Sequence, residues 1–164
     1  MYNIVELGGF KMENSVVFKL MEKKYHIAFA ESCTGGLCAA KLVSVPSASS
    51  VLNASFVTYA EEAKMKYLNV KRETIDKYNV VSENVAYEMA RGVAKETNSE
   101  VGVGVTGVAG PTGGTLDIPV GTVCFGFSIL GKVTTETVHF GDIGRNNVRK
   151  EACEYVFKRL NELL

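Results

Sequence analysis

Two glycine-containing stretches carry the residue types from which a catalytic or binding site can be built. The first is Glu-Ser-Cys-Thr-Gly-Gly at 31–36, and the second is Thr-Gly-Val-Ala-Gly-Pro-Thr-Gly-Gly-Thr at 106–115. The first offers a hydroxyl and a thiol as nucleophiles beside backbone N–H groups that can hold an oxyanion. The second is long enough to be a ligand-binding loop. The structural alternatives are an ordinary glycine turn with capping hydroxyls and a flexible connection.

Several common catalytic and metal-binding motifs are missing from the sequence. Only His26 and His139 provide an imidazole, and there is no H-E-x-x-H, Walker A or G-x-S-x-G motif. Residues 102–107 match G-x-G-x-x-G, but the glycines begin inside a predicted strand and no acidic residue lies at the expected distance. The spacing of the four cysteines fits neither a zinc site nor a redox motif. We therefore expect reduced thiols, no metal and no Rossmann dinucleotide site.

The composition is that of one globular domain without net charge. The chain has 164 residues, of which 46% are hydrophobic, and this is enough for a substantial core. Lys plus Arg and Asp plus Glu number 18 each, so no basic surplus favours nucleic acid. No apolar run is long enough to span a membrane, and the first residues lack the apolar core of a signal peptide. We expect a cytoplasmic protein that binds neither nucleic acid nor membrane.

The hydrophobic patterning predicts helices interspersed with strands. Strands are expected at 26–31, 55–59, 101–105, 121–129 and 133–140, and helices at 14–24, 37–43, 61–68, 73–77, 82–96 and from 145 onwards. Gly102 and Gly104 alternate with valines, so another backbone or a ligand should approach the third strand closely. The order predicts a three-layer α/β/α fold with a mixed, mostly parallel sheet of about five strands, one of them antiparallel. Residues 13–164 form this single domain after an N-terminal arm at 1–12, and either Met1 or Met12 can be the start.

Six segments with distinctive residues follow one another from about residue 13 to the end of the chain: 30–36, 57–64, 81–83, 106–111, 119–123 and 145–149. Together they resemble the C-terminal domain of the competence/damage-inducible protein CinA. The resemblance implies the fold of that domain and the activity of a nicotinamide-nucleotide amidase. Such an enzyme hydrolyses the carboxamide of nicotinamide mononucleotide to nicotinate mononucleotide and ammonia in pyridine-nucleotide salvage. The resemblance also implies a serine/lysine hydrolase without metal or cofactor, and a homo-oligomer, as a dimer or larger.

The resemblance assigns catalytic roles to Ser32, Lys64 and Tyr59. Ser32 would attack the amide carbon, Lys64 would take its proton, and Tyr59 would relay or orient that proton. An ordinary lysine, with a pKa near ~10.4, is almost fully protonated at neutral pH, so burial or neighbouring cations must lower it. Cys33 is an alternative nucleophile, but the sequence places no histidine to activate it.

Substrate binding is assigned by the resemblance to seven residues: Thr34, Gly35, Gly36, Thr106, Gly107, Gly110 and Arg145. Backbone N–H groups around Thr34 and Gly35 are expected to form the oxyanion hole. Thr106, Gly107 and Gly110 would line the nucleotide, and Arg145, at the start of the last helix, would bind its phosphate in bidentate fashion. Arg149, one turn later, is expected to be a surface or interface charge.

Three departures from the family pattern leave other hypotheses open. Glu61 stands where the family usually has Asn and would raise the pKa of Lys64, Ile118 replaces a Lys, and Ile143-Gly144 are extra residues that would shift Arg145. The alternative function is a catalytically weakened nucleotide-binding or regulatory module of the same fold. A third hypothesis is an amidase for another small amide.

Overall fold

The computed structural model describes residues 11–164, in which helices and strands are interspersed. The helices are α1 (Met12–Lys23), α2 (Leu37–Val43), α3 (Glu61–Leu68), α4 (Arg72–Tyr78), α5 (Glu83–Glu96) and α6 (Arg145–Leu163), with a short 3-10 helix η1 (Ala48–Ser50). The strands are β1 (Ile27–Glu31), β2 (Leu52–Val57), β3 (Val101–Gly107), β4 (Thr122–Ile129) and β5 (Lys132–His139). The expected arm at 1–12 lies almost entirely outside the described residues. No helix in the described part of the chain is long and apolar enough to cross a membrane.

The five strands form one sheet in the order β2-β1-β3-β4-β5. β1 pairs in parallel with β2 and β3, whereas β4 runs antiparallel to both β3 and β5. β5 therefore points the same way as the parallel strands, and β4 is the reversed one, which confirms the predicted mixed, mostly parallel sheet. Glu31 lies opposite Val57 of β2 and Val105 of β3. The carboxyl ends of three neighbouring strands are thus level with one another.

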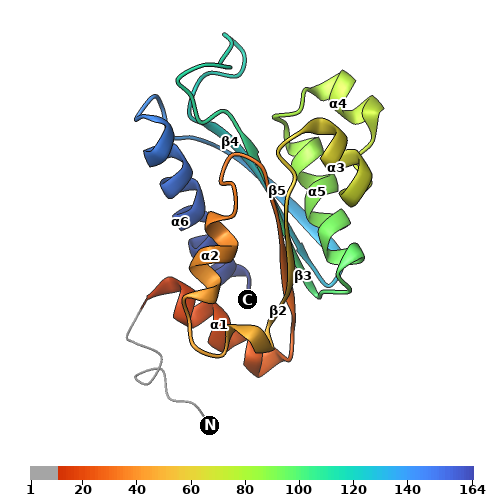
Figure 1. Ribbon diagram of the computed structural model, residues 1–164, viewed down its shortest axis with the longest axis vertical. Coiled ribbons are helices and arrows are strands. Elements are labelled where there is room, and N and C mark those ends of the chain that lie inside the picture. The colour runs from red at the N-terminus through yellow and green to blue at the C-terminus, as the bar shows by residue number, and fades with distance from the viewer. Residues whose placement is uncertain (1–10) are drawn as a thin grey trace.

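Helices cover both faces of the sheet and complete the predicted three layers (Figure 1). α1, α2 and α6 lie on one face, and α3, α4 and α5 lie on the other. Successive side chains of β1 point to opposite faces of the sheet. Phe29 belongs to the core under α1, α2 and α6, whereas Ala28 and Ala30 belong to the core under α5. In the first of these cores, which is the larger one, the buried ring of Phe29 packs against the ring of Phe157 from α6.

The glycines of β3 allow α5 to lie very close to the sheet. A Cβ at Gly104 would lie 2.6 Å from the carbonyl oxygen of Ala86, and one at Gly102 would lie 2.2 Å from that of Ala90. The predicted close approach to this strand is therefore confirmed, and the approaching group is the backbone of a helix rather than a ligand.

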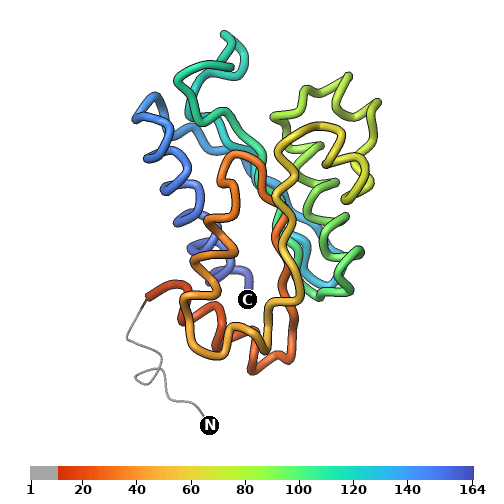
Figure 2. Tube along the Cα trace, in the orientation of Figure 1, coloured from red at the N-terminus to blue at the C-terminus, as the bar shows by residue number. Residues whose placement is uncertain are grey.

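Four connections come together at the end of the molecule that lies away from α1 (Figure 2). They are the turn after β1, the segment between β2 and α3, the long glycine loop between β3 and β4, and the segment before α6. Open α/β sheets bind ligands at the carboxyl ends of their strands, so this end is where a site is expected.

Candidate active site

The residues at 32–36, called the Ser32 turn below, connect β1 to α2. The Ser32 N–H donates to the carbonyl oxygen of Val105 at 3.0 Å, which continues the pairing with β3 by one residue. Gly35 and Gly36 have φ angles of +59° and +96°, a conformation that favours glycine. The turn therefore holds Ser32 at the carboxyl edge of the sheet.

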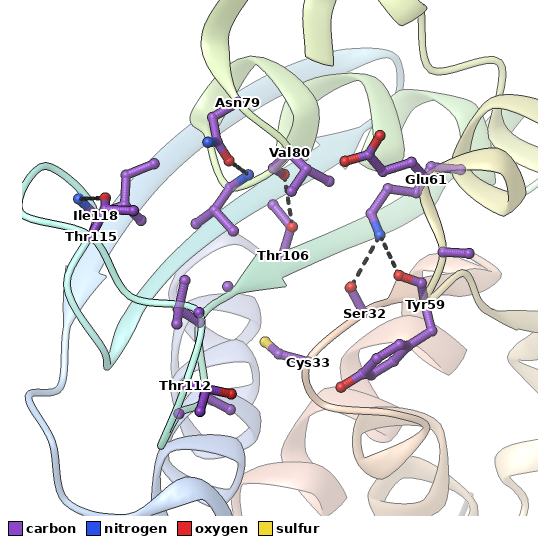
Figure 3. A pocket seen from close by; sticks show the side chains of 18 of the residues that line it. Ser32, Cys33, Tyr59, Glu61, Asn79, Val80, Thr106, Thr112, Thr115 and Ile118 are labelled. Atoms are coloured by element: carbon purple, nitrogen blue, oxygen red, sulfur yellow. Dashed lines mark hydrogen bonds between the residues drawn. The ribbon is translucent and has the colours of Figure 1, made fainter. Parts of the chain in front are cut away.

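Lys64 is buried beside Ser32. Its side chain comes from α3, is only 1% exposed, and places Nζ 3.1 Å from Ser32 Oγ. Nζ also donates to the carbonyl oxygen of Thr58 at 2.7 Å and to that of Tyr59 at 3.2 Å. Figure 3 shows the contacts with Ser32 and Tyr59. A neutral amine has two hydrogens, and these two carbonyl groups can accept both of them. In this neutral form the remaining lone pair is free to accept the proton of the Ser32 hydroxyl, as a general base requires.

Burial lowers the pKa of Lys64 to about 8, and the electrostatic effects of neighbouring Cys33 and Glu61 oppose this shift only in part. At pH 7 a pKa of about 8 leaves roughly a tenth of the amine neutral. The lowered pKa needed for a lysine base is therefore present. The residues from 11 to 164 include no cluster of three His, Cys, Asp or Glu side chains that could hold a metal ion.

Tyr59 contacts Lys64 through its backbone and not through its phenol group. The ring extends away from the carbonyl that Lys64 contacts (Figure 3), and its hydroxyl accepts a hydrogen bond of 2.7 Å from Arg145 Nη2. Arg145 Nη1 donates to the carbonyl oxygen of Gly110 at 3.0 Å. Tyr59 therefore connects to the group expected to bind phosphate, and its hydroxyl is not placed as a proton relay between Ser32 and Lys64.

Arg145 reaches the site even though Ile143 and Gly144 precede it. The Ile143 N–H donates to the carbonyl oxygen of Gly141, and Gly144, with a φ of +88°, is the N-cap residue of α6. The two residues are thus taken up in a turn at the start of the helix. Arg145 begins α6, as the sequence predicts.

A cleft of about 500 Å³ opens over Ser32 and Lys64. Its walls come from the Ser32 turn, the start of α3, the segment before α5 and the glycine loop, and include Tyr59, Thr106, Gly107, Gly110 and Arg145. Of the seven residues assigned to substrate binding, the last four line the cleft, whereas Thr34, Gly35 and Gly36 do not. Ile118 also lines it and contributes no charge.

The backbone N–H groups of the Ser32 turn fall into two sets. Some donate hydrogen bonds within the protein, and others lie on the side of the cleft. The Gly35 N–H donates to the Ser32 carbonyl oxygen, and the Gly36 N–H donates to Glu31. Backbone N–H groups of Cys33 and Thr34 partly offset the rise that burial causes in the pKa of the Cys33 thiol, so they lie near this sulfur, and Cys33 lines the cleft. In this arrangement, Cys33 and Thr34 carry the N–H groups that can serve an oxyanion.

Two charged residues contact the Ser32 turn although the sequence assigns neither a catalytic nor a binding role to them. Glu31 is fully buried and accepts hydrogen bonds from three backbone N–H groups, those of Gly36, Cys38 and Ala39. Arg149 donates from Nε and Nη2 to the carbonyl oxygens of Cys33 and Thr34, at 3.0 Å and 3.1 Å. Arg149 is thus half-buried against the turn, whereas the sequence suggested only a surface or interface charge.

Glu61 and Cys33 both lie close to Lys64. The Glu61 carboxylate lines the cleft but accepts a hydrogen bond of 2.8 Å from Arg72 Nη1, and it affects the pKa of Lys64 less than burial or Cys33 does. Burial raises the pKa of the Cys33 thiol to about 12, so the thiol stays protonated. These properties favour Ser32 over Cys33 as the nucleophile.

Comparison with known proteins gives one consistent result. The family model of the CinA C-terminal domain matches residues 10–164. The crystal structure of "competence/damage inducible protein CihA" from Agrobacterium tumefaciens superimposes with a TM-score of 0.90 at 33% identity, and 93% of each chain is covered. A CinA superfamily protein from Escherichia coli gives a TM-score of 0.88 at 32% identity over 100% of this chain and 99% of that chain.

Two curated relatives are longer than this chain. One from Clostridium botulinum (strain Loch Maree / Type A3) is 42% identical over 161 residues, and one from Alkaliphilus oremlandii (strain OhILAs) is 44% identical over 158 residues. Both are named "Putative competence-damage inducible protein". The matches cover 96% of this chain but only 39% and 38% of these relatives, so the chain spans about two fifths of their length.

Proposed function

The chain belongs to the CinA C-terminal domain family, and from this premise we propose that it hydrolyses the carboxamide of nicotinamide mononucleotide to nicotinate mononucleotide and ammonia. The observation that carries the proposal is the 3.1 Å approach of buried Lys64 Nζ to Ser32 Oγ. Two carbonyl groups hold the amine, and its pKa is lowered to about 8. These are the properties that a lysine needs in order to activate a serine.

In the first half of the reaction, Ser32 forms a bond to the amide carbon. Neutral Lys64 takes the hydroxyl proton as Oγ attacks, and the carbonyl oxygen becomes an oxyanion. The N–H groups of Cys33 and Thr34 receive this charge, and each such donor is worth about 3–4 kcal/mol in a preorganised site. Lys64 then returns the proton to the departing nitrogen, so that ammonia leaves and an ester on Ser32 remains.

In the second half of the reaction, water attacks the ester on Ser32, and Lys64 again acts as the base. Lys64 takes a proton from water, the resulting hydroxide adds to the ester carbon, and the bond to Ser32 Oγ breaks. The proton passes from Lys64 to Oγ, which restores both groups and releases the carboxylate product. Amide and water are thereby converted into acid and ammonia, with one base serving both steps.

The rest of the cleft suits a nucleotide. Lys64 and Arg145 are the basic side chains among the residues that line it, and Arg145 lies toward the glycine loop through its bond to Gly110. A guanidinium can meet a phosphate with two parallel hydrogen bonds. We assign Tyr59 to substrate binding, because its hydroxyl contacts Arg145.

The alternative of a nucleotide-binding module without turnover draws its support from Glu61 and from residues 143–144. Glu61 pairs with Arg72, and Arg145 still lines the cleft. Both observations remove reasons to expect weakened activity, and they favour the hydrolase.

The test is turnover of nicotinamide mononucleotide by the purified protein without added metal. Ammonia and nicotinate mononucleotide are measured together, with Ser32→Ala as the control, and nicotinamide without its ribose phosphate as a second substrate. We expect release by the wild type alone and little from free nicotinamide. Saturable binding without turnover would instead support the nucleotide-binding module, and preference for another amide would overturn the substrate.

We also propose that the chain self-associates. β5 is an edge strand of the sheet, and an edge presents unpaired backbone groups to a second copy. Sedimentation analysis at several concentrations is expected to give a dimer or larger species, and a monomer at all concentrations would contradict this.

A further inference from the structure

Glu31 holds one side of the Ser32 turn through backbone N–H groups. Its carboxylate accepts from Gly36, Cys38 and Ala39 at 2.9–3.1 Å, and the side chain is fully buried. The N-cap residue of α2, Gly36, has no side chain to satisfy the first donors of the helix. A carboxylate from the preceding strand does so instead, which fixes the turn against the start of α2.

Arg149 holds the other side of the same turn through backbone carbonyl groups. Its guanidinium reaches across from α6 and donates to two consecutive carbonyl oxygens, those of Cys33 and Thr34. A Cβ at Gly35 would lie 3.4 Å from Arg149 Nη2, so the guanidinium packs directly over the turn. Arg149 also donates from Nη1 to Asn146, which supports its orientation.

The contacts of Arg149 decide which way two peptide groups of the turn point. In a trans peptide the C=O and N–H bonds point in opposite directions. With the Cys33 carbonyl turned toward α6, the Thr34 N–H must point away from α6, and it faces the Cys33 thiol at the cleft. With the Thr34 carbonyl turned the same way, the Gly35 N–H is directed back to the Ser32 carbonyl oxygen.

We propose that Arg149 and Glu31 are positioning residues that together orient the Ser32 turn for acyl transfer. The Arg149 guanidinium donates hydrogen bonds to carbonyl oxygens of the turn, and the Glu31 carboxylate accepts hydrogen bonds from N–H groups at its end. Together they orient the Thr34 N–H toward the oxyanion beside Ser32. This inference rests on the proposed role of Ser32 as a nucleophile. Neither side chain is among the residues that line the cleft, so in this proposal both act through the turn.

This placement predicts a specific kinetic pattern. Loss of the hydrogen bonds from Arg149 or Glu31 to the turn disturbs the oxyanion donors, while the walls of the cleft stay in place. The value of kcat should therefore fall while KM changes little, because the lost interaction forms only in the transition state. A role in stability alone would lower the melting temperature and leave kcat unchanged well below it.

The test compares Arg149→Lys and Glu31→Gln with two matched controls, Arg91→Lys and Glu151→Gln, at exposed positions on α5 and α6. Two rates are measured below the melting temperature of each variant. One is the release of ammonia from nicotinamide mononucleotide, and the other is the covalent labelling of Ser32 by a fluorophosphonate. The second rate does not depend on the identity of the substrate.

We expect Arg149→Lys to lower kcat and the labelling rate by about 10–100-fold with KM within about threefold, since a lysine cannot form the two parallel hydrogen bonds. Glu31→Gln should act in the same direction, and the controls should match the wild type. For Arg149→Ala, added guanidinium ion should restore part of the labelling rate.

Wild-type rates in folded Arg149→Lys and Glu31→Gln, or a loss confined to KM, would overturn the inference. If the wild type is labelled at Ser32 but releases no ammonia, the proposed substrate fails while the variants still decide the role of Arg149 and Glu31. If the wild type is not labelled at all, the positioning role is overturned together with the nucleophile.

Discussion

The Ser32 turn and the glycine loop at 108–121 leave neighbouring parallel strands at the same edge of the sheet, yet they are held in different ways. The turn is fixed by charged side chains from β1 and α6 and by the β3 backbone. The glycine loop is closed at its base by hydrogen bonds between Val108 and residues 121–122, and its tip by bonds between Thr115 and Ile118. At this tip the Leu116 side chain is fully exposed.

The difference matches two requirements of the proposed reaction, which are the precise positioning of the reacting atoms and the enclosure of the substrate. Atoms that react must stay within a fraction of an ångström of their productive positions, and displacement of about 1 Å already lowers the rate strongly. A loop that encloses a substrate has no such requirement. The following predictions separate the two regions, the reacting one around Ser32 and Lys64 and the binding one around Arg145 and the glycine loop.

The largest effect is expected from the reacting region. Lys64→Met removes the base that contacts Ser32, and kcat should fall by about 10²–10⁴-fold. Steady-state ammonia release checks this, with the exposed neighbour Lys66→Met as the matched control. Comparable losses in both variants would show that the buried amine has no special role.

The buried amine should also leave a signature in stability. The pKa of Lys64 is about 8 in the folded protein against an ordinary 10.5, so between these pH values the unfolded chain binds more protons than the folded one. Stability therefore rises with pH across this window, by about 3 kcal/mol in all. Denaturant unfolding of the wild type minus that of Lys64→Met from pH 7 to 10.5 isolates the contribution, and a flat difference would contradict the lowered pKa.

In the binding region the effect should appear in KM. Arg145→Ala is expected to raise KM for nicotinamide mononucleotide by about 10–100-fold, because hydrogen bonds from a charged donor contribute about 1.5–3 kcal/mol. Leu116→Ser, at the exposed tip of the glycine loop, should stay within about twofold of the wild type. A fall in kcat alone for Arg145→Ala would place Arg145 in the reacting region.

The smallest effect concerns the Glu61–Arg72 pair at the edge of the cleft. Arg72→Gln leaves the Glu61 carboxylate unpaired, and this should raise the pKa of Lys64. Exposed ion pairs contribute up to about 1 kcal/mol, so the midpoint of the pH profile should rise by less than about one unit. The double variant Arg72→Gln/Glu61→Gln should reverse the rise, and a downward shift in the single variant would exclude this coupling.

The sequence could predict features that depend on nearby residues, but not contacts between residues far apart along the chain. Strand and helix patterning gave the layers and the single reversed strand. The two glycine-containing stretches located Ser32 and the glycine loop, whereas Lys64 was assigned only through the family resemblance. The contact of Arg149 with the turn was missed because Arg149 lies 116 residues from Cys33 along the chain, and only the packing of α6 brings them together. The direction of the Tyr59 hydroxyl likewise depends on Arg145, 86 residues away.

The most direct test of a serine activated by a buried lysine is the pH dependence of fluorophosphonate labelling at Ser32. The account predicts that the labelling rate rises with pH to a plateau, with a midpoint at about 8, because the rate follows the neutral form of Lys64. The rise should be absent in Lys64→Met, which should label slowly at every pH. A wild-type rate that does not change between pH 6 and 10, or one that Lys64→Met reproduces, would contradict the account.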